Sequence, residues 1–170
     1  KAMSELFGSN WGHGLFKYKA CDFCDDVVGE TADISIGDAW LKEYECNSAG
    51  TNVVVVRSEV LNKILLEGRS VDHLHLDPIP VEKVVESQAG GIRHRREGLA
   101  YRLHLEDDAG NWRPKKRVAP SASHLSQKQR RIYAMRYKIS QKSHEAFAIA
   151  KVQRKLGIFL QTIKPFTDLY

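Results

Sequence analysis

Residues 19–40 read KACDFCDDVVGETADISIGDAW, and the interpretation of the chain starts from them. The segment begins with two cysteines separated by two residues, Cys21 and Cys24, and ends in an alternating apolar and polar run at 32–38. Alternation with a period of two predicts a β-strand. Two thiols at this spacing can hold one edge of a metal or iron–sulfur site. A strand that ends in glycine and aspartate lets a ligand approach the backbone beside a carboxylate.

The elements predicted after this segment indicate the α/β fold class, with a small sheet flanked by helices. A continuous β-branched run, as at 53–56, is typical of a buried strand, and Ser58 is a suitable N-cap for the helix that follows it. The predicted strands are 32–38, 53–56 and 71–76, and the predicted helices are 59–68, 81–88 and 97–106. A helix between two strands predicts a βαβ unit with a right-handed crossover.

The composition changes after residues 120–123, which read PSAS, and this change predicts two domains. The first is an α/β domain at 1–120 and the second a basic helical tail at 121–170. Between Ser126 and Lys164, ten lysines and arginines are opposed only by Glu145, a local net charge of +9 in a chain whose total is +5. Apolar residues recur there at helical intervals, which predicts one broken helix or two, ending before Pro165.

A basic amphipathic helix is compatible with three environments. It can contact an anionic membrane surface peripherally, dock on an acidic protein partner, or pack on its own domain with a solvated basic face. Nucleic-acid binding is not favoured, because aromatic residues are not interleaved with the charges as a stacking platform. The sequence contains no run of eighteen apolar residues, so no transmembrane span is expected.

Three cysteines do not form a secreted disulfide framework, and we expect a reducing, cytoplasmic location. Three interpretations of Cys21 and Cys24 are open from the residues alone: structural thiols, a thioredoxin-like dithiol, and cluster ligands. The region before them, which contains Trp11 and Gly12, is a poor start for a thioredoxin-like fold. Cys46 precedes a turn-forming sequence and is interpreted as a free thiol.

Residues 19–97 resemble the C-terminal part of the coenzyme F420 hydrogenase/dehydrogenase beta subunit family. That family shows C-x-x-C-x-D, then A-D-I-S-x-G-D, then an apolar strand that ends in arginine. The matching elements here are Cys21, Cys24, Asp26, Ala32-Asp33-Ile34-Ser35, Gly37-Asp38 and Thr51-Asn52-Val53-Val54-Val55-Val56-Arg57. Residue 1 is not methionine and the pattern starts part-way through, so we interpret the chain as a fragment of a longer protein.

The resemblance implies part of an iron–sulfur flavoprotein oxidoreductase that passes electrons between a 4Fe–4S cluster, FAD and a soluble acceptor such as coenzyme F420. Cys21 and Cys24 would hold the cluster, with the other ligands in the upstream half of the protein; other oxidoreductase subunits are expected as partners. The fragment alone would then be inactive. The residues expected along the flavin are Asp33, Ser35, Gly37, Asp38, Thr51 and Asn52. The competing hypothesis is a non-catalytic α/β interaction module.

Three arginines follow two glycines in the second informative segment, residues 87–96. Arg93, Arg95 and Arg96 could pair with phosphate or carboxylate groups of a flavin or deazaflavin cofactor. The resembled family has a Ser-Gln pair followed by a basic patch at this place, as here in Ser87-Gln88. The alternative is a solvated basic loop before a helix.

Overall fold

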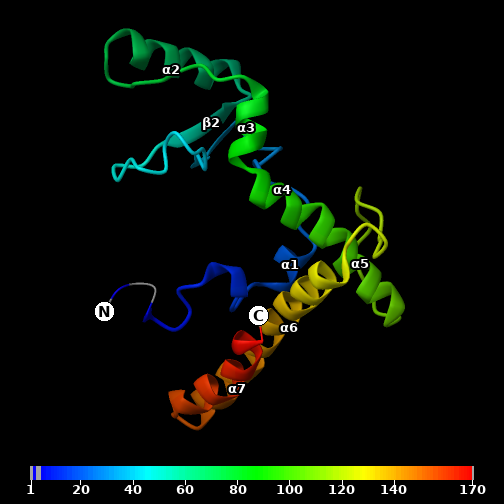
Figure 1. Ribbon diagram of the computed structural model, residues 1–170. Coiled ribbons are helices and arrows are strands. Elements are labelled where there is room, and N and C mark those ends of the chain that lie inside the picture. Colours follow the sequence, from blue (N-terminus) through cyan, green and yellow to red (C-terminus); the bar gives the residue numbers. More distant parts are fainter. Residues whose placement is uncertain (1, 3–4, 170) are drawn as a thin grey trace. The chain divides into compact units, whose positions relative to one another are not determined.

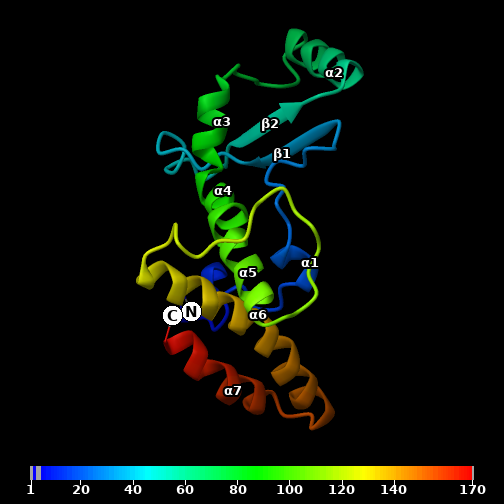
Figure 2. The ribbon, with the colours of Figure 1, turned by 90° about the vertical axis from the view of Figure 1, so that its right-hand side faces the viewer.

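A computed structural model describes residues 2 and 5–169 of the chain, and these residues form two compact units. The hairpin unit consists of Asp26–Arg95. The helical unit consists of the described residues up to Asp25 and from Arg96 onward. Figures 1 and 2 show the elements of each unit. No helix of the described part of the chain is both long and apolar enough to cross a membrane.

The hairpin unit contains two antiparallel strands, β1 (Ile34–Asp38) and β2 (Asn52–Val56). Ile34 pairs with Val56 at one end and Asp38 with Asn52 at the other. The α/β class with flanking helices is confirmed, but the predicted βαβ unit is wrong. Residues 71–76 form no strand, and Asp72 has a φ of 58°. Residues 71–76 instead form a largely exposed connection between two helices, in spite of their alternating apolar and polar side chains.

Three helices complete the hairpin unit. Helix α2 spans Glu59–Ser70, and the predicted N-cap is confirmed because the Ser58 hydroxyl accepts the Leu61 N–H at 3.5 Å. Helix α3 spans Val81–Ser87 and α4 spans Ala89–Arg95. The segment with two glycines is thus helical and not a loop.

The helical unit begins with the short helices η2 (Trp11–His13) and α1 (Lys19–Asp22) and continues, from Arg96, with α5 (Glu97–Asp108), α6 (Gln127–Val152) and α7 (Leu156–Asp168). Helix α6 starts at a capping box, in which Ser126 and Gln129 each accept the other's backbone N–H. The tail was predicted to form one broken helix or two, and it forms two. The predicted end before Pro165 is wrong, because α7 continues through this proline to Asp168.

Helices α6 and α7 form a helical hairpin, seen in yellow to red in Figure 2. Its core consists of the buried residues Ala146, Ala150, Phe159 and Ile163, with Leu15 and Ile158 packed against them. The segment before α1 is fixed on α6, because the Ser143 hydroxyl accepts the Phe16 N–H at 2.8 Å and the Ser140 hydroxyl donates to the Lys17 carbonyl at 3.0 Å. The helical unit therefore joins residues before α1 to the predicted tail.

Candidate functional site

The two motif cysteines lie at the end of α1 and directly after it, in a segment we call the cysteine loop (residues 21–25). Cys21 is exposed, Cys24 is half-buried, and neither forms a disulfide. The Cys24 N–H donates to the Cys21 carbonyl at 3.4 Å, so the loop is a tight turn. Phe23, between them, is buried against Leu99 and Leu103 of α5. This buried ring anchors the loop on the helical unit.

Asp22 of the cysteine loop is buried and held from two sides. Its side chain is 2% exposed and forms an ion pair with Lys17, in which Lys17 Nζ lies 2.5 Å from Asp22 Oδ1. Arg102 of α5, also 2% exposed, donates from Nε to the Asp22 carbonyl at 2.7 Å. Burial lowers the pKa of Lys17, and the Asp22 carboxylate offsets this only in part. The Cys21–Cys24 turn is therefore fixed by two cations.

A second carboxylate lies one turn after Arg102. Glu106 of α5 is buried, and the Tyr137 hydroxyl of α6 donates to its Oε1 atom. Burial and the neighbouring Glu106 carboxylate raise the pKa of Tyr137, so the hydroxyl keeps its proton at neutral pH. This buried hydrogen bond thus links α5 to α6.

Asp25 closes the cysteine loop with contacts to the segment after α5. Lys116 Nζ lies 3.2 Å from Asp25 Oδ1, and Arg117 Nε lies 3.2 Å from Oδ2. Arg117 also donates to the Asp25 carbonyl at 3.1 Å. Burial alone would raise the pKa of Asp25, but the hydrogen bond from Lys116 and the two positive charges hold it below its ordinary value. This carboxylate stays ionised at neutral pH.

Four cations therefore contact Asp22 and Asp25, which follow Cys21 and Cys24 directly in the sequence. Positive charge at this place would favour an anionic ligand held by the two cysteines. Sequence reasoning identified the cysteines but missed Lys17 and Arg102, which are distant from each other in the chain. Lys116 and Arg117 were missed as well; the two acidic residues of the cysteine loop were the available signal for such partners.

The cysteine loop supplies too few ligands for a complete iron–sulfur cluster. A 4Fe–4S cluster takes four thiolates, and the loop offers two. Cys46 is an exposed free thiol in the hairpin unit. Among the described residues, no group of three or more histidine, cysteine or acidic side chains could hold a metal ion.

Three of the predicted flavin-side residues, Asp38, Thr51 and Asn52, lie at the loop end of the β-hairpin. Asp38 pairs with Asn52, and the Thr51 carbonyl accepts the Ala39 N–H at 2.9 Å. Gln88, between α3 and α4, donates from Nε2 to the Asp38 carbonyl at 2.9 Å. The Gln88 side chain thus fixes the end of β1 to the helices, which gives the Ser-Gln pair a structural link to the strand motif.

The other predicted flavin-side residues lie elsewhere in the hairpin unit. Asp38 and Thr51 line a hollow of about 210 Å³, whereas Ser35 and Gly37 line a separate hollow of about 170 Å³. Asp33 precedes β1, and its carbonyl accepts the Arg57 N–H at 2.8 Å. Pockets for drug-sized ligands measure roughly 300–1,000 Å³, so neither hollow encloses a flavin dinucleotide. The predicted flavin-side residues are thus divided between two small hollows and the residue before β1.

The predicted basic segment lies at the end of α4. Arg93 is exposed and forms no ion pair with any residue that the structure describes. Arg95 and Arg96 are half-buried, and both interact with neighbouring groups. Cations in the last turn of a helix also interact favourably with its dipole. Arg93 is therefore the member of the three that is available to a ligand.

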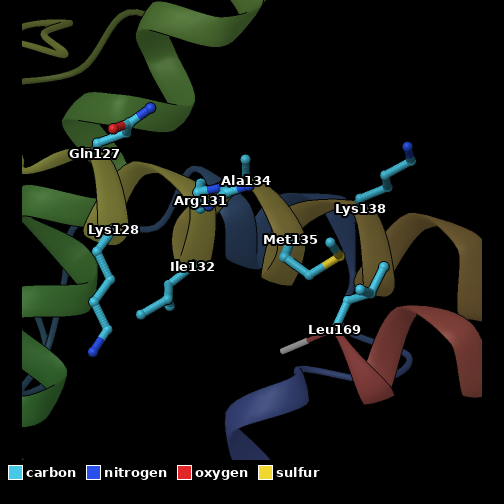
Figure 3. A pocket seen from close by; sticks show the side chains of 8 residues that line it. All are labelled: Gln127, Lys128, Arg131, Ile132, Ala134, Met135, Lys138 and Leu169. Atoms are coloured by element: carbon cyan, nitrogen blue, oxygen red, sulfur yellow. The ribbon is translucent and has the colours of Figure 1, made fainter.

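A larger hollow, of about 770 Å³, lies along the first half of α6. Figure 3 shows Lys128, Ile132 and Met135 projecting from α6 to the same side, with Leu169 at the end of α7 opposite them. Arg131 and Lys138 also line it, so the hollow combines apolar and cationic side chains. Sequence reasoning identified the charge of this helix and not the hollow.

Comparison with known proteins gives one match. Residues 3–82 match the family model for the C terminus of the "Coenzyme F420 hydrogenase/dehydrogenase, beta subunit". No curated protein and no solved structure matches the chain. The matched segment includes the cysteine loop and the β-hairpin but not α4 to α7. The resemblance expected from the sequence is thus confirmed: residues 3–82 form a segment like the C terminus of the coenzyme F420 hydrogenase/dehydrogenase beta subunit.

Proposed function

We propose that the chain is part of an iron–sulfur flavoprotein oxidoreductase that passes electrons between a 4Fe–4S cluster, a flavin and a soluble acceptor such as coenzyme F420. The observation that carries the proposal is the cysteine loop, which lies within the matched segment and is anchored by Phe23, Lys17 and Arg102. Two surface thiols without a function would not need a loop that is anchored by three such contacts.

In this proposal each residue of the cysteine loop has a defined part. The bound cluster supplies one-electron transfer. Cys21 and Cys24 provide two of its thiolates, and Phe23 excludes water from the inner side of the loop. Lys17 and Arg102 hold the loop conformation and, with Lys116 and Arg117, offset negative charge there. The remaining ligands come from outside this segment, from upstream sequence or from another subunit.

The hairpin unit would provide an edge for the flavin. The strand from Asp33 to Asp38, which includes Ser35, and residues Thr51 and Asn52 would lie along it, with Gly37 allowing close approach of the backbone. Arg93, Arg95 and Arg96 would meet its phosphates or the acidic groups of the acceptor. Because neither of the two hollows described above encloses a flavin, a further part of the protein or a partner subunit would cover it.

The proposal is tested by comparing the native protein with the 170-residue chain produced alone. The native protein is expected to be brown-yellow, with iron and flavin absorption, because all ligands are present. The isolated chain is expected to fold with its two units and, after anaerobic reconstitution, to hold no intact cluster, because it supplies only two suitably spaced thiols. Iron content, visible absorption and circular dichroism give the readouts.

Two outcomes would contradict these expectations separately. Four iron atoms per isolated chain, in a monomer, would show that the ligand assignment is wrong. A colourless native protein would refute the redox function and support the second candidate, a non-catalytic interaction module. The uncovered hollow along α6, with its cationic and apolar lining, is the observation that favours this second candidate.

Arg93→Gln is expected to weaken flavin or deazaflavin binding by about tenfold, which corresponds to about 1.4 kcal/mol. The reason is loss of one charge-assisted hydrogen bond to phosphate. The free energy of unfolding should change by less than about 0.5 kcal/mol, because Arg93 is exposed and forms no ion pair among the described residues. Equilibrium titration and urea unfolding measure the two quantities.

Arg69→Gln is the matched control for this prediction. Arg69 is also an exposed arginine in the last turn of a helix of the hairpin unit, at the end of α2. It should leave cofactor affinity unchanged. Equal losses of affinity in the two variants would mean that overall charge, and not the α4 position, decides binding.

A further inference from the structure

The turn between α6 and α7 combines exposed aliphatic side chains with cations, in a segment we call the hairpin tip (residues 149–156). Val152 at the end of α6 is 85% exposed, Leu156 at the start of α7 is 60% exposed, and Ile149 is 51% exposed. The core between the two helices is formed by other residues, such as Ala150 and Phe159. The three aliphatic residues are therefore a separate apolar surface.

Three cations, Lys151, Arg154 and Lys155, alternate with this apolar surface. None of them forms an ion pair with a residue that the structure describes. No acidic residue occurs between Glu145 and Asp168, and both of these are neutralised locally. Lys142 Nζ lies 2.5 Å from Glu145 Oε2, and Lys164 Nζ lies 2.6 Å from Asp168 Oδ2. The hairpin tip thus has an uncompensated positive charge.

The backbone of the hairpin tip is fixed, and it holds one cation in an unfavourable conformation. The Lys155 N–H donates to the Ala150 carbonyl at 3.0 Å and the Arg154 N–H to the Lys151 carbonyl at 3.2 Å, the pattern of a Schellman helix end. Arg154 has a φ of 52°, in the left-handed region, where glycine is the usual residue. An arginine in this conformation lowers the stability of the turn relative to glycine. Because stability does not explain the choice of arginine at this position, we infer that the Arg154 side chain has a role at the surface.

We propose that the hairpin tip docks on an anionic membrane surface. Val152, Leu156 and Ile149 would enter the boundary between headgroups and acyl chains, and Lys151, Arg154 and Lys155 would pair with anionic headgroups. The uncompensated positive charge of the hairpin tip, next to exposed aliphatic side chains, favours an anionic membrane surface as the partner. A nucleic acid would use aromatic stacking, whereas the most exposed apolar residues of the tip are aliphatic. The hollow suited to a protein segment lies at the other end of the helical hairpin and includes no residue of the tip.

This inference goes beyond the redox proposal, because the tip lies outside the segment that the family model matches. It is tested with the full chain and lipid vesicles by co-flotation. The chain is expected to bind vesicles of phosphatidylcholine mixed with phosphatidylserine, and to bind vesicles of phosphatidylcholine alone at least tenfold more weakly. Lys151→Gln, Arg154→Gln and Lys155→Gln combined should weaken binding on the order of 100-fold, since each cation near an anionic surface contributes a roughly fivefold effect.

The matched control removes the same charge from the same helical hairpin: Lys128→Gln, Arg131→Gln and Lys138→Gln combined. Its binding should fall at least tenfold less than that of the tip variant, and equal losses would overturn the proposal in favour of overall charge. Val152→Ser with Leu156→Ser should weaken binding while leaving the charge intact; unchanged binding would overturn insertion of the tip. Arg154→Gly keeps the fold, because glycine suits the turn, and should weaken binding about fivefold. A folded chain that binds neither vesicle also overturns the proposal.

Discussion

Cys21→Ser and Cys24→Ser, made separately in the native protein, are each expected to remove most of the cluster iron and the visible absorption that comes with it. Each variant replaces one thiolate ligand by a hydroxyl, which ligates iron in such clusters poorly. The protein itself should remain folded, because Cys21 is exposed and Cys24 is half-buried, while Phe23 and Arg102 still anchor the loop. Iron per chain and the visible spectrum measure the effect.

Cys46→Ser provides the control for both variants. Cys46 is a free, exposed cysteine in the hairpin unit, so the same chemical change is made away from the cysteine loop. This variant should retain its iron. Survival of the cluster in both loop variants would show that Cys21 and Cys24 are not ligands. Loss of iron in all three would mean that general oxidation or misfolding, and not ligation, decides the result.

The sequence predicted those parts of the fold that local pattern determines. The β-hairpin strands, the Ser58 cap and the two tail helices follow from alternation, β-branching and helical spacing within short segments. The strand at 71–76 was predicted wrongly by the same rule. Alternation of histidine with leucine has the period of a strand, but a strand also needs a partner, and β1 and β2 form a hairpin that residues 71–76 do not join.

In helix α4 the sequence led to the opposite error, because regular structure formed where a loop was predicted. Gly90 and Gly91 have low helix propensity, so the sequence favoured a loop. The structure makes them helical, and a Cβ added at Gly91 would lie 3.2 Å from a side-chain carbon of Val27. Close packing of the hairpin unit, and not freedom of the backbone, is therefore the reason for glycine at this position.

The supporting cations of the candidate site could not be predicted from local pattern. The sequence of α5 gives no sign that Arg102 is buried, because arginine is normally exposed. Its burial follows from a contact with Asp22, eighty residues earlier in the chain. Only the assembled helical unit brings Lys17, Asp22 and Arg102 together.

Arg102→Met is expected to lower the free energy of unfolding of the helical unit by about 3–5 kcal/mol, the range for breaking a buried charged contact. Methionine replaces the apolar part of the side chain but donates no hydrogen bond. The Asp22 carbonyl loses its 2.7 Å donor, and the buried carboxylates of Asp22 and Glu106 lose a nearby positive charge. Urea unfolding measures the loss, and a faster reaction of Cys24 with a thiol reagent should report loosening of the cysteine loop.

Arg113→Met is the control that separates burial from charge. Arg113 forms a two-pronged ion pair with Asp107 of α5, at 2.6 and 2.7 Å, but this pair lies at the surface. Surface ion pairs contribute about 0–1 kcal/mol, so this variant should stay within about 1 kcal/mol of the wild type and leave the reactivity of Cys24 unchanged. If Arg102→Met proved no more costly than Arg113→Met, Phe23 and Lys17 would suffice to hold the loop. Arg102 would then have no part in positioning the two thiols.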